Sequence, residues 1–319
     1  MPGDGFDGDS APRRGHVDSI RMLSRILRTR RSPSPYLLVR IMRTRHLACL
    51  LLVLSSVPVA AEDRPLSAPD IMMRVAANQD SAQKLRAEYV YQQRVRVATH
   101  RTNGKLAREE TAEYLVTPTA DGIKKELKKI EGRYWYKGKY LEFHKEPVPD
   151  RHSLDGDLVD DFRHDAVDNE SKDGIARDLF PLTTKEQRQY SFTLAGEEAF
   201  RGRKVYRIRF RPADKDDYTW TGEAVIDAGE FEPVTVFTRL SRRIPLAVRT
   251  LLGTDLPGLG FNVEYRRFEE GIWFPVSFGT EFRLHVLFFL NRVITVSVEN
   301  SAFERAKVDT KILGFEPTQ

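Results

Sequence analysis

The residues best suited to chemistry form an acidic stretch near the middle of the chain. Five aspartates lie there with two histidines beside them: Asp155, Asp157, Asp160, Asp161 and Asp165, with His152 and His164. Carboxylate oxygens suit Ca²⁺, and imidazoles suit transition metals. The stretch lacks the evenly spaced ligands and terminal Glu of a calcium loop, and helical spacing would spread its acids around a surface. We therefore interpret it as a solvated helix face and predict no metal.

Two further histidines could act as a general base. His285 begins an apolar segment and His144 follows a predicted strand. The sequence contains no Gly-x-Ser-x-Gly elbow, phosphate-binding loop, dinucleotide fingerprint or paired-histidine zinc helix. We predict no catalytic residue and no cofactor. A hydrolase site at the mouth of a barrel, built from the acids or His285, is kept as an alternative.

A second set of side chains is suited to binding. Between Lys204 and Arg211, apolar residues alternate with arginines, and the pattern recurs in 261–265 and 272–282. Alternation with period two is typical of strands with one apolar face. We expect one sheet face to carry Tyr206, Ile208, Phe210, Phe261, Tyr265, Phe274, Phe278 and Phe282. These side chains either fill the core of a tightly wrapped sheet or line a cavity for an acyl chain, and both hypotheses stay open.

The surrounding elements are mostly strands. Residues 71–87 have helical spacing with Ser67 as the cap, and strands are predicted over 89–143 and 190–303. Residues 147–184 lose the strand pattern and suit short amphipathic helices. The predicted class is α+β, mainly β: a curved antiparallel sheet forming an incomplete barrel, with the N-terminal helix and the helical insert packed at its concave side.

Two apolar tracts stand out within the second strand region. The first, 244–260, joins two strands with more aliphatic side chains than a solvated loop carries. The second runs from Leu284 to Leu290 and on to Val298. It predicts either a strand buried on both faces or an apolar lip or cavity wall that touches lipid.

The basic character of the chain belongs to its first 61 residues. The formal net charge is +5, from 51 Lys and Arg against 46 Asp and Glu. Ten of the arginines and four of the aspartates lie in residues 1–61, which leaves 41 basic and 42 acidic residues in 62–319. A body so close to neutral argues against a nucleic-acid partner.

That leader has the organisation of a secretory signal. Arginines between Met42 and Arg45 precede the apolar run 47–57, which is too short to span a bilayer, and small residues end at Ala61. We expect cleavage after Ala61 and Met42 as the initiator. The only cysteine, Cys49, lies inside the apolar run and not at its end, so we predict a soluble periplasmic protein without a lipid anchor or disulfide.

Three short phrases in residues 66–303 resemble a known family. They are Gly202–Ile208, Trp220–Asp227 and Gly271–Pro275. With the order of signal peptide, helix, strands and helical insert, the chain resembles the periplasmic half-barrel superfamily of LolA, LolB and RseB, and most of all homologues described as outer membrane lipoprotein-sorting protein-like. The resemblance implies an incomplete barrel capped by helices, a hydrophobic cavity and non-catalytic handling of lipid or lipoprotein acyl chains.

The sequence therefore predicts a single half-barrel domain, 62–319, that holds acyl chains for transfer to the outer membrane. Its expected partners are lipid or lipoprotein acyl chains and a protein of the outer or inner membrane. The alternative is a non-catalytic envelope sensor or protein-interaction module of the same fold. That alternative predicts a filled interior and a groove on the outer face.

Overall fold

The structure, a computed structural model, describes residues 65–119, 122–145, 153–165, 180–214, 220–241, 254–255, 259–268, 271–286 and 290–306. The chain divides into two compact units, Met1–Leu66 and Ser67–Gln319, and every element below belongs to the second. The predicted leader, most of the first apolar tract, and residues 147–152 and 166–179 of the insert lie outside the described residues. No helix in the described part of the chain is long and apolar enough to cross a membrane.

Helix α2 (Ala68–Arg86) opens the described chain and has the predicted cap. The Ser67 hydroxyl accepts from the Asp70 backbone N–H, and the Asp70 carboxylate accepts from the Ser67 N–H in return. Its buried face repeats every three or four residues and consists of Ala68, Ile71, Met72, Val75, Ala76, Gln79, Ala82 and Arg86. Helical spacing with Ile71, Val75 and Ala82 in the sequence predicts Leu85 on this face as well. That prediction was wrong, because Leu85 is 43% exposed and Arg86 is buried in its place.

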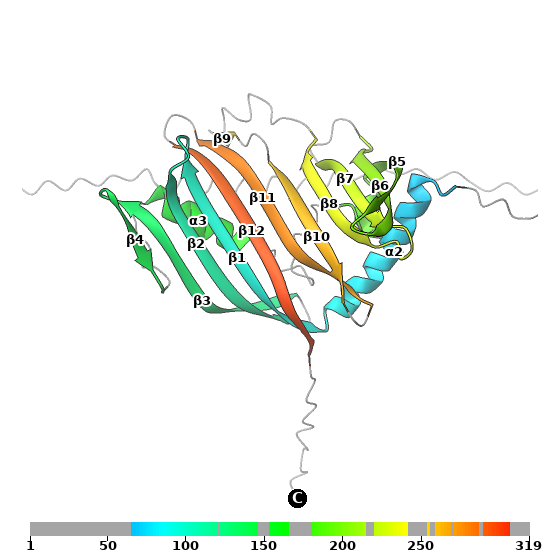
Figure 1. The fold of residues 1–319 in the computed structure, drawn as a ribbon, viewed down its shortest axis with the longest axis horizontal. Coiled ribbons are helices and arrows are strands. Elements are labelled where there is room, and N and C mark those ends of the chain that lie inside the picture. The colour runs from blue at the N-terminus through cyan, green and yellow to red at the C-terminus, as the bar shows by residue number, and fades with distance from the viewer. Residues whose placement is uncertain are drawn as a thin grey trace, which may run out of the picture. The chain divides into compact units, whose positions relative to one another are not determined.

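All the strands described join one antiparallel sheet (Figure 1). Its twelve strands run in the order β4-β3-β2-β1-β12-β11-β10-β8-β7-β6-β5, with β9 paired to β11. The bounds are β1 Tyr89–Arg101, β2 Leu106–Pro118, β3 Ile123–Tyr136, β4 Lys139–Phe143, β5 Tyr190–Phe200, β6 Arg203–Pro212, β7 Trp220–Asp227, β8 Pro233–Leu240, β9 Thr254–Asp255, β10 Gly260–Arg267, β11 Trp273–Val286 and β12 Leu290–Arg305.

Most strands fall where alternation predicts them, with two differences. The weak alternation before Gly132 and the aromatic run after it form one strand, β3. The apolar tract from Leu284 to Val298 is divided between the end of β11 and β12, which pair antiparallel. The prediction of one strand buried on both faces was therefore wrong. Asn291 and Arg292 interrupt the apolar tract in the sequence, but Arg292 is a strand residue opposite Leu284.

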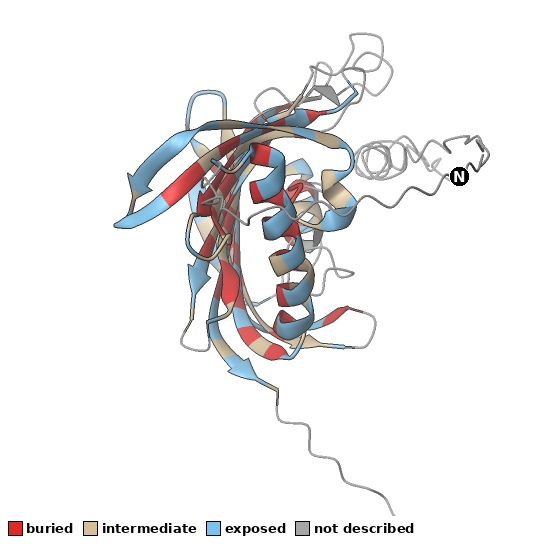
Figure 2. Ribbon diagram, turned by 90° about the vertical axis from the view of Figure 1, so that its right-hand side faces the viewer, coloured by how far each residue is buried: buried red, intermediate tan, exposed pale blue. Residues whose placement is uncertain are grey.

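One face of this sheet, called the inner face below, is apolar along an unbroken row of paired residues. The row crosses ten strands from β3 to β5 through Ile130, Ala112, Val95, Val298, Phe278, Val263, Val236, Ala224, Ile208 and Leu194. Residues paired across strands share a face, so the row defines one continuous apolar surface. The sheet bends around α2 and is not closed into a barrel (Figure 2). The predicted fold class is confirmed.

Two helices of the insert region complete the described fold. Helix α3 (Leu154–Asp165) packs on β1 and β2, and the single turn α4 (Thr184–Gln187) contacts α2 and β5. Gln187 donates its side-chain amide to the backbone carbonyl of Met72, which ties the end of the insert to α2. The insert therefore returns to the inner face, as predicted.

Candidate functional site

The side chains expected to share one face are buried together, with one exception. Ile208 and Phe278 belong to the apolar row described above, and Phe282, four residues further along β11, pairs with Ile294. Phe210 and Tyr206 lie on either side of Ile208 in β6. Phe261, which is half-buried, and Tyr265 flank Val263 in β10. The inner face therefore brings seven of the eight predicted residues to one surface.

The exception is Phe274. A bulge shifts the register between β10 and β11, so that Tyr265 lies opposite Pro275 and Phe274 opposite Arg266. An extra residue in one strand reverses which side chains face inward beyond it. Phe274 is buried in a separate aromatic cluster, with ring centroids 5.0 Å from Tyr89 and 4.3 Å from Phe303. Its expected place on the common face was wrong.

Rings from other elements cover the aromatic side chains of the inner face. Phe282 meets Phe162 of α3 edge-on, with centroids 5.5 Å apart, and Phe278 meets Phe180 at 6.5 Å. Phe261 stacks on Phe278 at 5.4 Å. Two of these covering rings, Phe162 and Phe180, belong to the insert. The insert therefore forms part of the cover over the middle of the inner face.

The acids of the insert hold α3 to the sheet. Asp155 receives two hydrogen bonds from Arg292, at 2.7 and 2.8 Å, and a third from Thr99. Further along the helix, Arg163 contacts Asp160 in its own helix and donates to the Tyr114 hydroxyl at 2.9 Å. The interpretation of this stretch as a purely solvated face was therefore wrong, because Asp155 points to the strands.

Below α3 lies a buried charge network. Arg108 donates two hydrogen bonds to Glu110, and Arg163 comes within 3.4 Å of the other carboxylate oxygen. Arg108, Glu110 and Arg163 are each at most 4% exposed. Arg108 also lies against the rings of Tyr134 and Phe143, at 5.4 and 5.3 Å. A buried charge needs such partners, because its desolvation is costly.

The remaining chemical candidates stay apart. His285 is half-buried in β11 opposite Asn291 and Asp255, and His144 is exposed after β4. Within the described ranges, no group of His, Cys, Asp and Glu is arranged to hold a metal ion. His152 and the side chains of His164 and Asp165 lie outside those ranges.

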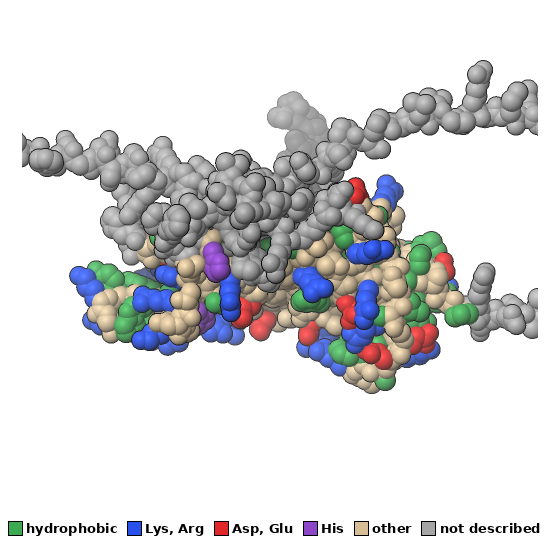
Figure 3. Space-filling model, turned by 90° about the horizontal axis from the view of Figure 1, so that it is seen from above, with side chains coloured by type: hydrophobic (Ala, Val, Ile, Leu, Met, Phe, Trp, Pro, Cys, Tyr) green, Lys and Arg blue, Asp and Glu red, His purple; other side chains and the backbone are tan. Residues whose placement is uncertain are grey.

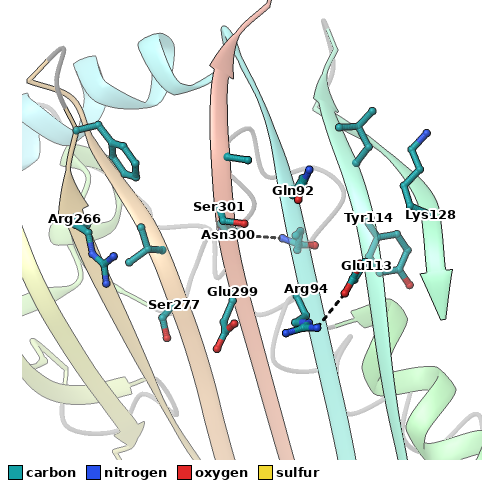
Figure 4. A pocket seen from close by; sticks show the side chains of 15 residues that line it. Gln92, Arg94, Glu113, Tyr114, Lys128, Arg266, Ser277, Glu299, Asn300 and Ser301 are labelled. Carbon is teal, nitrogen blue, oxygen red and sulfur yellow. Dashed lines mark hydrogen bonds and ion pairs between the residues drawn. The ribbon is translucent and has the colours of Figure 1, made fainter. Parts of the chain in front are cut away.

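The opposite face of the sheet carries a groove of about 700 Å³ (Figure 4). Six neighbouring strands from β10 to β3 line it, and its polar side chains include Gln92, Arg94, Glu113, Lys128, Arg266, Ser277, Glu299 and Ser301. The cross-strand row Glu113, Arg94, Glu299, Ser277 runs through it, one position from the apolar row on the other face. The sheet thus separates an apolar inner face from a polar outer groove.

Three bulges lie in this groove. Register shifts occur between Val90 and Gln92, between Glu113 and Tyr114, and between Glu264 and Tyr265. The extra residues are Ala302, which has a φ of 51°, together with Lys128 and Val276, and all three line the groove. Bulges bend strands and increase their twist, so bulges on neighbouring pairs hollow the sheet. The sensor alternative predicted a groove on the outer face, but the sequence did not give its position or its lining, because a one-residue bulge leaves no mark in the alternation.

The groove has both signs of charge. Arg94 pairs with Glu113 at 3.1 Å, whereas Arg266 and Glu299 form no ion pair with any described residue. Lys128 pairs with Glu126 at 2.5 Å. Arg266 and Glu299 are therefore available to a ligand that carries both charges.

Comparison with known proteins gives structural likenesses only. No family model matches the chain, and no curated protein matches it. A LolA superfamily protein from Nitrosomonas europaea is 12% identical, with 78% of this chain and 98% of that chain covered and a TM-score of 0.32. A putative outer membrane lipoprotein-sorting protein domain from Vibrio parahaemolyticus is 11% identical, covering 70% and 89%, with a TM-score of 0.31.

A third similar structure is lipoprotein LppX from Mycobacterium tuberculosis, 10% identical over 76% of this chain and 100% of that one, with a TM-score of 0.25. The first of these structures carries the name of the LolA superfamily, which the sequence also resembles.

Proposed function

We propose that this protein is an exported carrier that holds an acyl chain of a lipid or lipoprotein against its inner face and passes it towards the outer membrane. The observation that carries the proposal is the apolar row across ten paired strands of an open sheet. A core that is fully closed does not need an apolar row across ten strands. A long apolar surface on an open sheet suits a hydrocarbon chain, which can lie along it. Each methylene buried there contributes about 0.8 kcal/mol.

The insert is the cover that has to move. Phe162 and Phe180 pack edge-on against Phe282 and Phe278, the two inner-face rings of β11. Edge-on ring contacts contribute about 1 kcal/mol each beyond their buried area. When Phe162 and Phe180 move away, an acyl chain can take their place and cover Phe282 and Phe278 again. The ring-to-ring contacts are therefore the closed state of the proposed site.

Export accounts for the leader. We propose that residues 1–61 hold a signal peptide with Met42 as the true start and cleavage after Ala61, so that the half-barrel 62–319 works in the periplasm. Expression of the full chain in a bacterial host, followed by N-terminal sequencing of the periplasmic product, tests this directly. A product that starts at Glu62 is expected, and one retained in the cytoplasm with its leader contradicts the proposal.

Ligand binding is tested on the same processed protein. We expect lipid to be extracted from it and a fluorescent fatty acid to bind to the delipidated form. Phe282→Ala is expected to weaken that binding about tenfold, because it removes a buried ring from the proposed contact surface. Phe237→Ala removes an exposed ring from β8 and serves as the matched control. A protein that contains no lipid and binds no probe refutes the carrier.

A second function is favoured by the outer groove. The bulged strands and the charges of Arg266 and Glu299 suit an extended protein segment of mixed charge, as in the sensor or protein-interaction module predicted as the alternative. In a peptide-array assay, Glu299→Lys is expected to shift the preferred peptides from cationic to anionic. Lys84→Glu, on the exposed side of α2, is the control. If Glu299→Lys leaves the peptide preference unchanged, the groove is not the peptide-binding site.

A further inference from the structure

The tip of the β3–β4 hairpin exposes large aromatic side chains. Trp135 is 38% exposed, Tyr136 46% and Tyr140 40%. All three lie in the last two residue pairs before the hairpin loop. Single exposed apolar residues are ordinary, but a cluster of them marks an interaction surface. β4 is also an edge strand of the sheet, so nothing described in the sheet lies beyond it. The cluster is outside both the inner face and the outer groove.

Aromatic rings occupy both faces of this hairpin. Trp135 pairs with Tyr140 across the strands, with ring centroids 5.0 Å apart, and Tyr136 pairs with Lys139 on the opposite face. Tyr134, on the same face as Tyr136, is half-buried and its ring is covered by the Arg108 guanidinium. A strand that only covers a core is apolar on one face. Rings on both faces of an exposed tip therefore serve contact with something outside the chain.

Positive charge surrounds these rings. Lys137 forms the turn, with its ammonium nitrogen 5.2 Å from the Tyr136 ring, and Lys139 follows it. Neither lysine forms an ion pair with a residue that the structure describes. Arg133 lies over the Tyr140 ring at 5.3 Å. At the left-hand end of Figure 3, where β3 and β4 lie, hydrophobic and Lys or Arg side chains are seen beside one another.

The tip is rigid before it meets any partner. Lys137 and Gly138 form a two-residue loop with φ of 45° and 88°, the pattern of a tight hairpin turn. The Tyr140 hydroxyl donates to the Leu106 carbonyl at 3.2 Å, which joins β4 to β2. Fixed rings lose little conformational freedom on binding, so the surface is preorganised.

We propose that this hairpin tip docks on an anionic membrane surface. Trp and Tyr place their rings at the level of the lipid headgroups, with their polar atoms towards water. Lys137 and Lys139 supply the attraction to anionic headgroups, and an unpaired lysine is suited to this because no carboxylate competes for it. A neutral or acidic protein surface would use the rings but would not require anionic lipid. The inference does not depend on whether the inner face binds an acyl chain.

The experiment is cosedimentation of the processed full-length protein with vesicles. Vesicles of phosphatidylglycerol and phosphatidylcholine are compared with vesicles of phosphatidylcholine alone. We expect binding to the first and at least tenfold weaker binding to the second. Lys137→Gln and Lys139→Gln should each weaken binding to the anionic vesicles about fivefold. Lys84→Gln, an exposed lysine of α2, should leave it unchanged.

The rings are tested separately. The double variant Trp135→Ser with Tyr136→Ser is expected to lose about tenfold in affinity, while Phe237→Ser, which removes a ring 49% exposed on β8, keeps full binding. Acrylamide quenching of tryptophan fluorescence needs no variant, because Trp220 and Trp273 are buried and quenching reports mainly on Trp135. Anionic vesicles should protect that tryptophan.

Three results overturn the proposal. They are equal binding to neutral vesicles, unchanged binding in the lysine variants, and tryptophan quenching that vesicles do not reduce. Fatty-acid binding by the same variants separates this inference from the carrier function. A hairpin variant that still binds the fluorescent fatty acid but not the vesicles has lost only the docking surface.

Discussion

The two long helices contact the sheet in different ways. Helix α2 buries aliphatic side chains, with Ile71, Met72 and Val75 fully inaccessible to solvent. Helix α3 also buries Leu158 and Val159, but its ends are held by charged groups: Asp155 to Arg292 and Arg163 to Glu110. Apolar packing has no directional requirement, whereas a buried ion pair holds only in one geometry. Helix α2 is therefore held mainly by apolar packing, and in the proposed carrier α3 is the cover with a defined closed position.

The difference has a consequence for function. Removing α3 from the sheet would leave Glu110 and Arg108 paired with each other and accessible to water, which lowers the cost of opening. Removing α2 would expose the apolar side chains of its buried face, Ile71, Met72 and Val75 among them. The proposed entry of an acyl chain therefore follows displacement of the insert and not of the N-terminal helix. Four changes test this contrast.

The largest effect is expected from Glu110→Ala. The change leaves Arg108 and Arg163 buried without their carboxylate, and breaking a buried pair costs about 3–5 kcal/mol. Urea denaturation should show this loss in the free energy of unfolding. Glu113→Ala, which breaks a pair with Arg94 on the exposed face, should cost less than about 1 kcal/mol. Equal losses would mean that the network under α3 has no special role.

Ile71→Ala tests the apolar side of the contrast. It removes a fully buried side chain from α2, and the lost contact and cavity should cost about 3 kcal/mol. Met73→Ala in the same helix, where Met73 is 64% exposed, should change the free energy of unfolding by less than about 0.5 kcal/mol. A small effect at Ile71 would show that α2 is not fixed by packing.

Glu232 gives α2 a pH-dependent contact. The Gln79 side-chain amide donates to its carboxylate at 2.5 Å, and burial raises the pKa of Glu232 to about 7 from its ordinary 4.5. Between pH 4.5 and about 7, Glu232 is protonated in the native state but ionised in the unfolded chain. The free energy of unfolding should therefore fall as pH rises through this range.

Glu232→Gln removes that titration. We expect it to raise stability by about 2 kcal/mol at pH 8 and to change little at pH 4, measured by thermal unfolding across the range. Glu230→Gln, at a more exposed neighbour in the same turn, is the control. If the stability of the variant still falls between pH 4.5 and about 7 as that of the native protein does, another group is responsible for the pH dependence.

The smallest of the four effects is expected from Asp155→Asn. The change weakens a half-buried, two-bonded ion pair with Arg292, and hydrogen bonds to charged groups contribute about 1.5 kcal/mol. Hydrogen exchange of α3 amides should accelerate while that of α2 stays unchanged. Glu88→Gln, which loses an exposed pair with Arg305, should alter neither helix. Faster exchange in both helices would remove the distinction between core and cover.

Local patterns predicted much of this arrangement correctly. Ser67 caps α2 where the sequence predicts a cap. Ile208, Phe278 and Phe282 share a face as predicted, because side chains alternate between the two faces within each strand, whichever strands lie beside it. Gly202 and Gly271 separate stretches of strand alternation in the sequence, and both have a positive φ in the structure, which glycine adopts freely. These features depend on residues a few positions apart.

Other features depend on partners far along the chain. Arg108 and Glu110 lie in one strand and Arg163 in the insert, and only the packing of α3 buries them together. The bulge beside Tyr265 turns Phe274 away from the face that its alternation predicts. The groove lined by Arg266 and Glu299 exists because three such shifts meet on neighbouring strands.

The sequence by itself determined that one face of a large antiparallel sheet would be apolar, because period-two alternation is a property of each strand alone. Only the tertiary structure decided which rings cover that face, where the strands bend and which charges are buried. Those outcomes come from contacts between segments separated by many residues, and a linear pattern does not record them.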